Sequence, residues 1–203
     1  MKKEYINKSN SFDEQIKVLE NILLSSSRLK EILIRLSEST LNNYYVAAGS
    51  INQTVFNYYH GYDLNYGIDD FDIVYFDNDI SYEKEDSIIK YVSNLLKYID
   101  ARYDIKNEAR VHLWYKDKYG KDITPYTSLE DAISSWGTTI TCIGVRLENN
   151  KLVVYAPYGL DDLFTMTIRP VKRQYIEEQY KIKTKKWKDK WDKLKIVPWD
   201  NKS

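Results

Sequence analysis

The sequence predicts a single α/β (α+β) domain built around a mixed β-sheet. Short apolar segments with strand character alternate with amphipathic helical segments through the middle of the chain, as in domains whose helices pack on a sheet. The chain has 203 residues, 43% of them hydrophobic, which is enough for one substantial core. We find no internal repeat and no low-complexity linker, so we expect residues 1–203 to fold as one unit.

The N-terminal region, residues 1–42, predicts two helices. Ser11 followed by Glu14 is a capping-box pattern, and apolar residues then recur at helical spacing. A second helix is expected over residues 27–41. The apolar faces of the two helices would consist of Ile16, Leu19, Ile22 and Leu23 in the first, and Leu29, Ile32, Leu33 and Leu36 in the second.

Residues 43–168 are expected to form the central core of strands and helices. Strands are predicted from short apolar or alternating runs that end at glycine or at turn-forming residues. These strands cover residues 44–48, 70–76, 103–115, 138–147 and 152–155. Helices are predicted from apolar residues at helical spacing and from the caps Ser81 and Thr127. These helices cover residues 50–60, 81–99 and 127–133.

The predicted strand over residues 103–115 would place alternate side chains on opposite faces of the sheet. One face is apolar and would pack on the core through Val111, Leu113 and Tyr115. The other face is polar and consists of Glu108, Arg110, His112 and Trp114.

The C-terminal region, residues 169–203, predicts a basic amphipathic helix over residues 175–193, followed by a tail. Its apolar stripe would attach the helix to the domain. The stripe consists of Ile176, Tyr180, Trp187, Trp191 and Leu194.

The formal net charge is zero, with 30 basic and 30 acidic side chains, which argues against a generic binder of polyanions. The charges are unevenly distributed, because residues 63–86 carry nine acids and one base, whereas residues 172–195 carry ten bases and four acids. An acidic middle and a basic end indicate different roles for the two regions.

Several features favour a cytoplasmic protein. No run of about 18 uncharged apolar residues could span a membrane, and the N-terminus has no apolar segment of the kind a signal peptide requires. The single cysteine, Cys142, cannot form an internal disulfide.

The segment with the clearest chemistry is Asp70-Phe71-Asp72. Two carboxylates at i and i+2 of a strand lie on the same side, roughly 7 Å apart at the backbone. Burying two like charges together is costly unless a cation lies between them, and Mg²⁺ commonly takes one or two carboxylates together with phosphate oxygens. An Asp-x-Asp pair is also common in a solvated turn, so the pair alone leaves two interpretations open.

A second element, Ala48-Gly49-Ser50, lies between a predicted strand and a predicted helix. Such a turn directs free backbone N–H groups at an anion. Gly49 lacks the Cβ that would block a close approach, and the Ser50 hydroxyl would add another donor. The two elements together favour a site in which Gly49 and Ser50 hold phosphates while Asp70 and Asp72 hold their metal.

These motifs resemble the nucleotidyltransferase fold of the DNA polymerase beta superfamily, and more closely a bacterial family of nucleotidyltransferase-like proteins of unassigned substrate. The resemblance extends over residues 44–199. The matching stretches are Ala47-Ala48-Gly49-Ser50, Tyr58-Tyr59-His60-Gly61-Tyr62, Asp70-Phe71-Asp72-Ile73-Val74-Tyr75-Phe76-Asp77, Ala109-Arg110-Val111-His112-Leu113-Trp114-Tyr115 and Ala156-Pro157-Tyr158-Gly159-Leu160-Asp161-Asp162-Leu163-Phe164.

The resemblance implies roles for individual residues. Gly49 and Ser50 match the phosphate-cradling turn, and Asp70 and Asp72 match the metal-binding pair of the superfamily. The superfamily often adds a third carboxylate on a later strand that serves as base for the acceptor hydroxyl, and the polar face of residues 103–115 offers Glu108 for this role.

Two further residues on that face are candidates. His112 suits anion binding or proton transfer, although a hydrogen-bonded, half-buried histidine is an equally good interpretation. Arg110 is one of few arginines in a lysine-rich chain, and arginine is preferred where a planar phosphate contact is needed.

The leading hypothesis is therefore a Mg²⁺-dependent nucleotidyltransferase that moves a nucleoside monophosphate from an NTP to an unidentified hydroxyl acceptor and releases pyrophosphate. An alternative is a catalytically inactive module on the same fold that binds a nucleotide or a partner. Binding of RNA by the basic helix within residues 172–195 is a third, less favoured hypothesis.

Overall fold

The computed structural model describes residues 10–200; residues 1–9 and 201–203, which belong to the expected N-terminal region and C-terminal tail, lie outside the described residues. Within residues 10–200, a five-stranded mixed sheet has the strand order β3-β2-β1-β4-β5. Its strands are β1 (Tyr44–Ala47), β2 (Phe71–Tyr75), β3 (Tyr103–Asn107), β4 (Gly144–Glu148) and β5 (Lys151–Tyr155). β2 and β3 are parallel, and the other pairs are antiparallel. This arrangement confirms the expected fold class.

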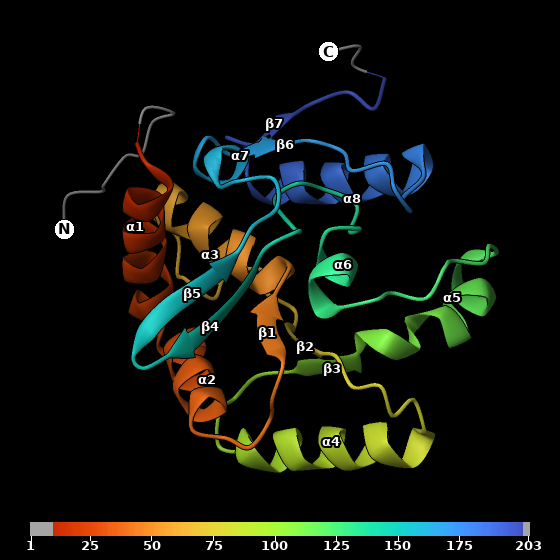
Figure 1. Ribbon diagram of the computed structural model, residues 1–203. Helices are drawn as coiled ribbons and strands as arrows, with labels where there is room; N and C mark the ends of the chain where they lie inside the picture. Colours follow the sequence, from red (N-terminus) through yellow and green to blue (C-terminus); the bar gives the residue numbers. More distant parts are fainter. Residues whose placement is uncertain (1–9, 201–203) are drawn as a thin grey trace.

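The main core lies on one face of the sheet. It joins β1, β2, β4 and the helices α1 (Phe12–Ser25), α2 (Ser27–Ser37), α3 (Gly49–His60) and α4 (Tyr82–Leu95). The capping box at Ser11 and the apolar faces expected for α1 and α2 are confirmed, except that Ile16 is only partly buried. Figure 1 shows α4 along the bottom of the molecule and α8 (Glu177–Lys190) along the top, with the sheet between them.

The opposite face of the sheet is only partly covered. A small apolar cluster there joins Tyr45, Ala47 and Val74 to α6 (Leu129–Ile133) and to Cys142. α5 (Val111–Tyr119) and α6 lie on the right side of Figure 1, below α8. The cleft described below lies on the uncovered part of this face, along β2 and β3.

The expected strand over residues 103–115 is wrong beyond Asn107. Glu108–Arg110 form a short 3₁₀ helix, η1, which leads directly into α5. β3 ends there because the pairing of β2 with β3 stops at Tyr75 and Asn107, and because Asn107 Oδ1 accepts a hydrogen bond from the N–H of Ala109 at 3.1 Å. A side-chain cap of this kind competes with the strand ladder.

The expected strand over residues 138–147 is shorter than predicted, because β4 begins only at Gly144. Residues 138–143 form turns in which the N–H groups of Thr141 and Cys142 donate to the carbonyl of Thr138, at 3.0 and 3.2 Å. The Thr138 and Thr141 hydroxyls also bond to one another and to this backbone. Local hydrogen bonding by these side chains replaces the ladder.

The C-terminal segment packs largely as expected. Tyr180, Trp187, Trp191 and Leu194 are buried, whereas Ile176 is exposed and does not belong to the apolar stripe. The indole N–H of Trp191 donates to Asn57 Oδ1 at 2.8 Å, which ties the end of α8 to α3. Beyond α7 (Asp161–Phe164), the chain forms a two-stranded parallel ribbon of β6 (Thr167–Ile168) and β7 (Lys195–Ile196). No helix among residues 10–200 has the length and apolarity needed to cross a membrane.

Candidate functional site

A cleft of about 340 Å³ lies against the uncovered face of the sheet. It is lined by the start of α3, by β2, by the β3–η1–α5 segment and by α8. Asp70, Asp72 and Glu108 all line this cleft, as does Gly49. Four of the residues singled out from the sequence are therefore brought to one place.

Asp72 lies in the middle of the sheet. It is opposite Ala47 of β1 and Asp104 of β3. Burial and, to a smaller extent, the neighbouring charge of Asp70 raise the pKa of Asp72 to about 6, while Lys106 and Lys183 act in the opposite direction. The side chain of the adjacent acid, Asp69, is 67% exposed, and its Oδ2 atom lies 3.9 Å from Nζ of Lys186. This arrangement supports Asp70 and Asp72, rather than Asp69, as the pair on the cleft.

Glu108 reaches the cleft although it lies on η1 and not on a strand. Its exposure is only 4%, and burial raises its pKa to about 8 against the opposing charge of Lys106. Its position is determined by Asn107, whose side chain also accepts from the N–H of Asp77 at 3.1 Å and donates to the Asp77 carbonyl at 2.9 Å. The segment that carries Glu108 is thus held by a link between the ends of β2 and β3.

Sequence reasoning missed Asp104 and Lys106 on β3. The register places Asp104 beside Asp72, and Lys106 is ion-paired with Asp104 and lines the cleft. Burial alone would lower the pKa of Lys106, but the hydrogen bond and charge of Asp104, with the charges of Asp72 and Glu108, raise it. The alternation of Asp104, Lys106 and Glu108 was the available signal, because strand residues at i and i+2 share a face.

The turn before α3 has the geometry of an anion site. Ala48 is the N-cap, with φ 54° and ψ −125°, and makes no side-chain hydrogen bond to the helix. A non-glycine residue in this region is strained, and such strain is common at functional sites. In the described part of the chain, the N–H groups of Gly49 and Ser50 make no backbone hydrogen bond. Gly49 lines the cleft, whereas Ser50 is fully buried, so Gly49 is the residue of this turn that can offer its N–H to an anion at the positive end of α3.

The Ser50 side chain does not take the place expected for it. Ser50 is fully buried, and its hydroxyl donates to the Ala47 carbonyl at 3.3 Å. Ser50 does not line the cleft, so the structure does not bring its hydroxyl to the place expected for a phosphate. Gln53, one turn further along α3, lines the cleft instead.

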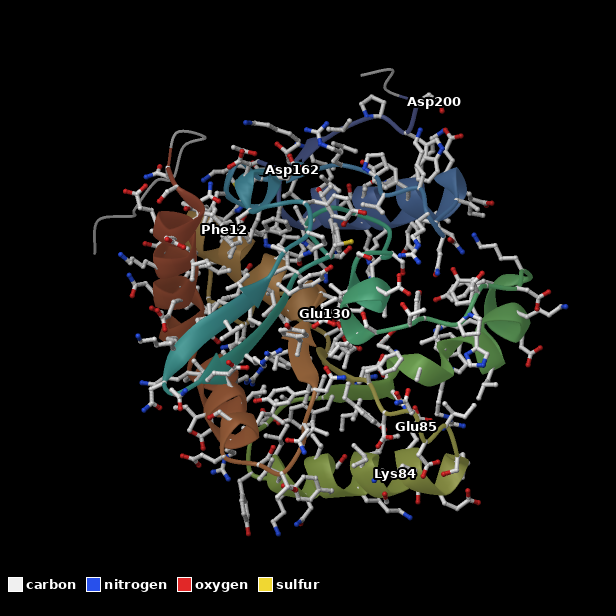
Figure 2. All side chains as sticks on the ribbon, in the orientation of Figure 1. Phe12, Lys84, Glu85, Glu130, Asp162 and Asp200 are labelled. Carbon is white, nitrogen blue, oxygen red and sulfur yellow. The ribbon has the colours of Figure 1, made fainter. Side chains whose placement is uncertain are left out.

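Arg110 and His112 do not line the cleft. The prediction that they share a polar face with Glu108 is therefore wrong. Arg110 is ion-paired with Glu85 of α4, and Figure 2 shows Glu85 beneath the segment that leads from β3 into α5. His112 is half-buried on α5. Its Nδ1 atom is buried without a hydrogen-bond partner among residues 10–200. Both expectations failed because they assumed strand alternation beyond Asn107.

The far side of the cleft is aromatic and basic, which the sequence did not predict. Trp114 and Tyr119 of α5, together with Tyr175 and Trp187 of the C-terminal segment, line it. Lys183 of α8 also lines it, with its Nζ 4.9 Å from the centre of the Trp187 ring. The apolar stripe of α8 therefore has a second role, since Trp187 both packs on the core and borders the cleft.

The oxygen donors of the cleft fit a hard divalent cation. Asp70 and Asp72 both line the cleft, and burial together with the charge of Asp70 makes the charged form of Asp72 costly, a cost that a cation bound between two carboxylates would offset. In residues 10–200, no three carboxylate, histidine or cysteine side chains are close enough to form a complete metal centre. A cation at Asp70 and Asp72 would therefore need further oxygen ligands, such as those of a bound phosphate.

Comparisons with known proteins agree with this geometry. A family model described as "Nucleotidyltransferase" matches residues 35–196, which include all seven strands. A structure solved by NMR and described as a CCA-adding enzyme head domain has 24% sequence identity and a TM-score of 0.72, and the alignment covers 90% of this chain and 95% of that chain. This likeness shows a shared fold. No curated protein matches the chain. Since the family model covers most of the chain, including both the Gly49 turn and the carboxylates of β2, the protein belongs to the nucleotidyltransferase family.

Proposed function

We propose that the protein is a Mg²⁺-dependent nucleotidyltransferase that moves a nucleoside monophosphate from an NTP to a hydroxyl acceptor and releases pyrophosphate. The observation that carries the proposal is the convergence of Asp70, Asp72 and Glu108 with the open N-terminus of α3 in one cleft. Family membership supports nucleotide transfer in general.

In this mechanism the protein contributes mainly positioning and charge. The N–H group of Gly49 holds the terminal phosphates at the start of α3. Asp70 and Asp72 would hold Mg²⁺, which supplies charge neutralisation for the phosphates when bound. The acceptor oxygen forms a bond to the α-phosphorus as the bond to the pyrophosphate oxygen breaks.

Glu108 is suited to take the proton of the acceptor hydroxyl. Burial raises its pKa to about 8, and a base is most effective when its pKa lies near the working pH. The same burial makes Glu108 a weaker ligand for a cation than Asp70 or Asp72, because the carboxyl must first lose its proton.

The proposal is tested by measuring pyrophosphate release and NTP binding with Mg²⁺. We expect Asp70→Asn and Asp72→Asn to lose transfer by about 100-fold or more, since metal neutralisation of transferring phosphates is worth several kcal/mol. Asp69→Asn is the matched control, because Asp69 is adjacent but faces Lys186 outside the cleft. Transfer at the normal rate by Asp70→Asn or Asp72→Asn would contradict the mechanism.

A module that binds nucleotide without turnover is the second candidate. It is favoured by the ion pair between Asp104 and Lys106, which neutralises part of the carboxylate cluster. Calorimetry with each of the four NTPs and Mg²⁺, followed by a panel of hydroxyl acceptors, separates the two candidates. Binding without pyrophosphate release would favour the module, and measurable turnover would exclude it.

A further inference from the structure

Lys183 is distinguished from its neighbours by where its ammonium lies. Among the described lysines of α8, it is the one that lines the cleft. It is half-buried, and its Nζ lies 4.9 Å from the centre of the Trp187 ring and 5.8 Å from that of Tyr175. The ring faces hold the ammonium inside the cleft by cation–π attraction.

The other lysines of α8 have partners within the chain. Three form ion pairs with acids, and two donate to backbone carbonyls. The pairs are Lys181 with Glu177, Lys185 with Asp189, Lys186 with Asp69, Lys188 with the carbonyls of Asp192 and Leu194, and Lys190 with the carbonyl of Gly67. Within residues 10–200, Lys183 has neither a hydrogen bond nor an ion pair, although it faces the cleft.

Lys183 and Asp72 nevertheless influence each other across the cleft. Burial lowers the pKa of Lys183, and the charge of Asp72 opposes that shift. In turn, Lys183 is among the charges that hold down the pKa of Asp72. A cation that is partly withdrawn from water and has no hydrogen-bonded partner is costly, so this position is explained best by an anion that enters the cleft.

We propose that Lys183 binds the triphosphate of the nucleotide, together with the N–H group of Gly49 at the start of α3. The inference rests on the proposed function and adds a residue to it from the far end of the chain. Lysine binds phosphate as a mobile point charge. In this view α8 contributes one cation to the cleft, while Lys186 and Lys190 connect the helix to residues 67–69.

The test compares Lys183→Met with Lys185→Met. Lys185 is on the same helix, is exposed and is paired with Asp189, so its loss controls for the removal of a charge. The probes are Mg²⁺ with inorganic tripolyphosphate, and Mg²⁺ with a non-hydrolysable analogue of each NTP, measured by calorimetry. Because hydrogen bonds to charged groups are worth about 1.5–3 kcal/mol, we expect Lys183→Met to weaken both probes by about 10- to 100-fold. Lys183→Arg should retain part of the affinity, and Lys185→Met should retain all of it.

The outcomes are distinct. Unchanged tripolyphosphate binding in Lys183→Met would overturn the inference, even if NTP binding fell, because the residue would then act on the base rather than on the phosphates. If the unmodified protein binds tripolyphosphate through Lys183 but transfers no nucleotide, the inference stands and the proposed transferase activity fails. If it binds neither probe, both are overturned. Melting temperatures of all variants control for folding, and Lys183→Gln serves if the methionine variant does not fold.

Discussion

Burial separates the carboxylates of the cleft from those on the surface. The pKa values of Asp72 and Glu108 are raised to about 6 and about 8, chiefly by burial. Exposed Asp79 shows the opposite shift, because the hydroxyl and N–H of Ser81 bond to its charged form and lower its pKa. The native protein therefore binds more protons at Asp72 and Glu108 than the unfolded chain does, which destabilises it as these groups ionise.

The sign of this effect gives a prediction for Glu108. Its pKa is higher in the folded protein, so its contribution falls as pH rises from the ordinary value of 4.5 to about 8. We expect Glu108→Gln, without added metal, to increase the free energy of unfolding by about 4 kcal/mol at pH 8 and by much less at pH 5.

Urea denaturation at the two pH values checks this prediction for Glu108. Glu38→Gln, at an exposed position after α2, is the control with the same chemical change. An equal difference between Glu108→Gln and the unmodified protein at pH 5 and at pH 8 would contradict the prediction. The gain in stability should accompany a loss of transfer, as is common where a site contains destabilising groups.

At the scale of secondary structure, α8 is attached mainly through Trp191, just beyond its last residue. Trp191 is fully buried, and its ring contacts Phe56 and Tyr66 at centroid distances of 5.7 and 6.1 Å. Asn57 accepts from its indole and also donates to the carbonyls of Leu64 and Tyr66. Asn57 thus joins α3 to the loop of residues 61–67 and to the end of α8.

Trp191→Phe should weaken this attachment. The change removes the indole donor and leaves Asn57 Oδ1 buried without it, which we expect to cost about 1–3 kcal/mol in the free energy of unfolding. Denaturant titration measures the change. Trp199→Phe is the matched control, since Trp199 is only partly buried and its indole N–H makes no hydrogen bond among residues 10–200. A loss no larger than that of the control would show that the indole bond does not hold α8.

Across the whole molecule, the acidic middle and the basic end lie against each other. Lys186 faces Asp69, and Lys190 donates to the carbonyl of Gly67. Lys183 is directed to the cleft that contains Asp72. The zero net charge is therefore also a local balance. Lys183 and Lys186 offset the negative charges of Asp72 and Asp69, and other lysines of α8 pair with acids of the same helix.

This balance predicts weak binding of RNA. A surface that neutralises phosphates binds with an affinity that falls steeply with salt, but most lysines of α8 are already engaged within the chain. We expect no retardation of a single-stranded RNA by the protein at roughly 150 mM salt. A complex that persists at this salt concentration and dissociates only as salt is raised further would instead assign the solvent side of α8 to RNA.

The elements with strong local signals agree with the sequence. The capping box of α1, the buried strand before Gly49, the Asp70–Asp72 pair and the packing of Trp187 and Trp191 all follow from periodicity and turn chemistry over a few residues. The patterns that predict these features lie within a few residues of one another in the chain, even where the contacts they lead to are distant, so a single sequence contains the information needed to predict them.

Other features depend on partners that are distant in sequence. β3 stops at Asn107 because its neighbour β2 ends there, and this end turns Glu108 into the cleft while Arg110 goes to Glu85. Lys183 comes into the same cleft because α8 packs on α3 through Trp191. The sequence alone therefore determines the pair of carboxylates and the turn beside it. Long-range packing, which local patterns do not encode, brings Glu108 and Lys183 into the same cleft.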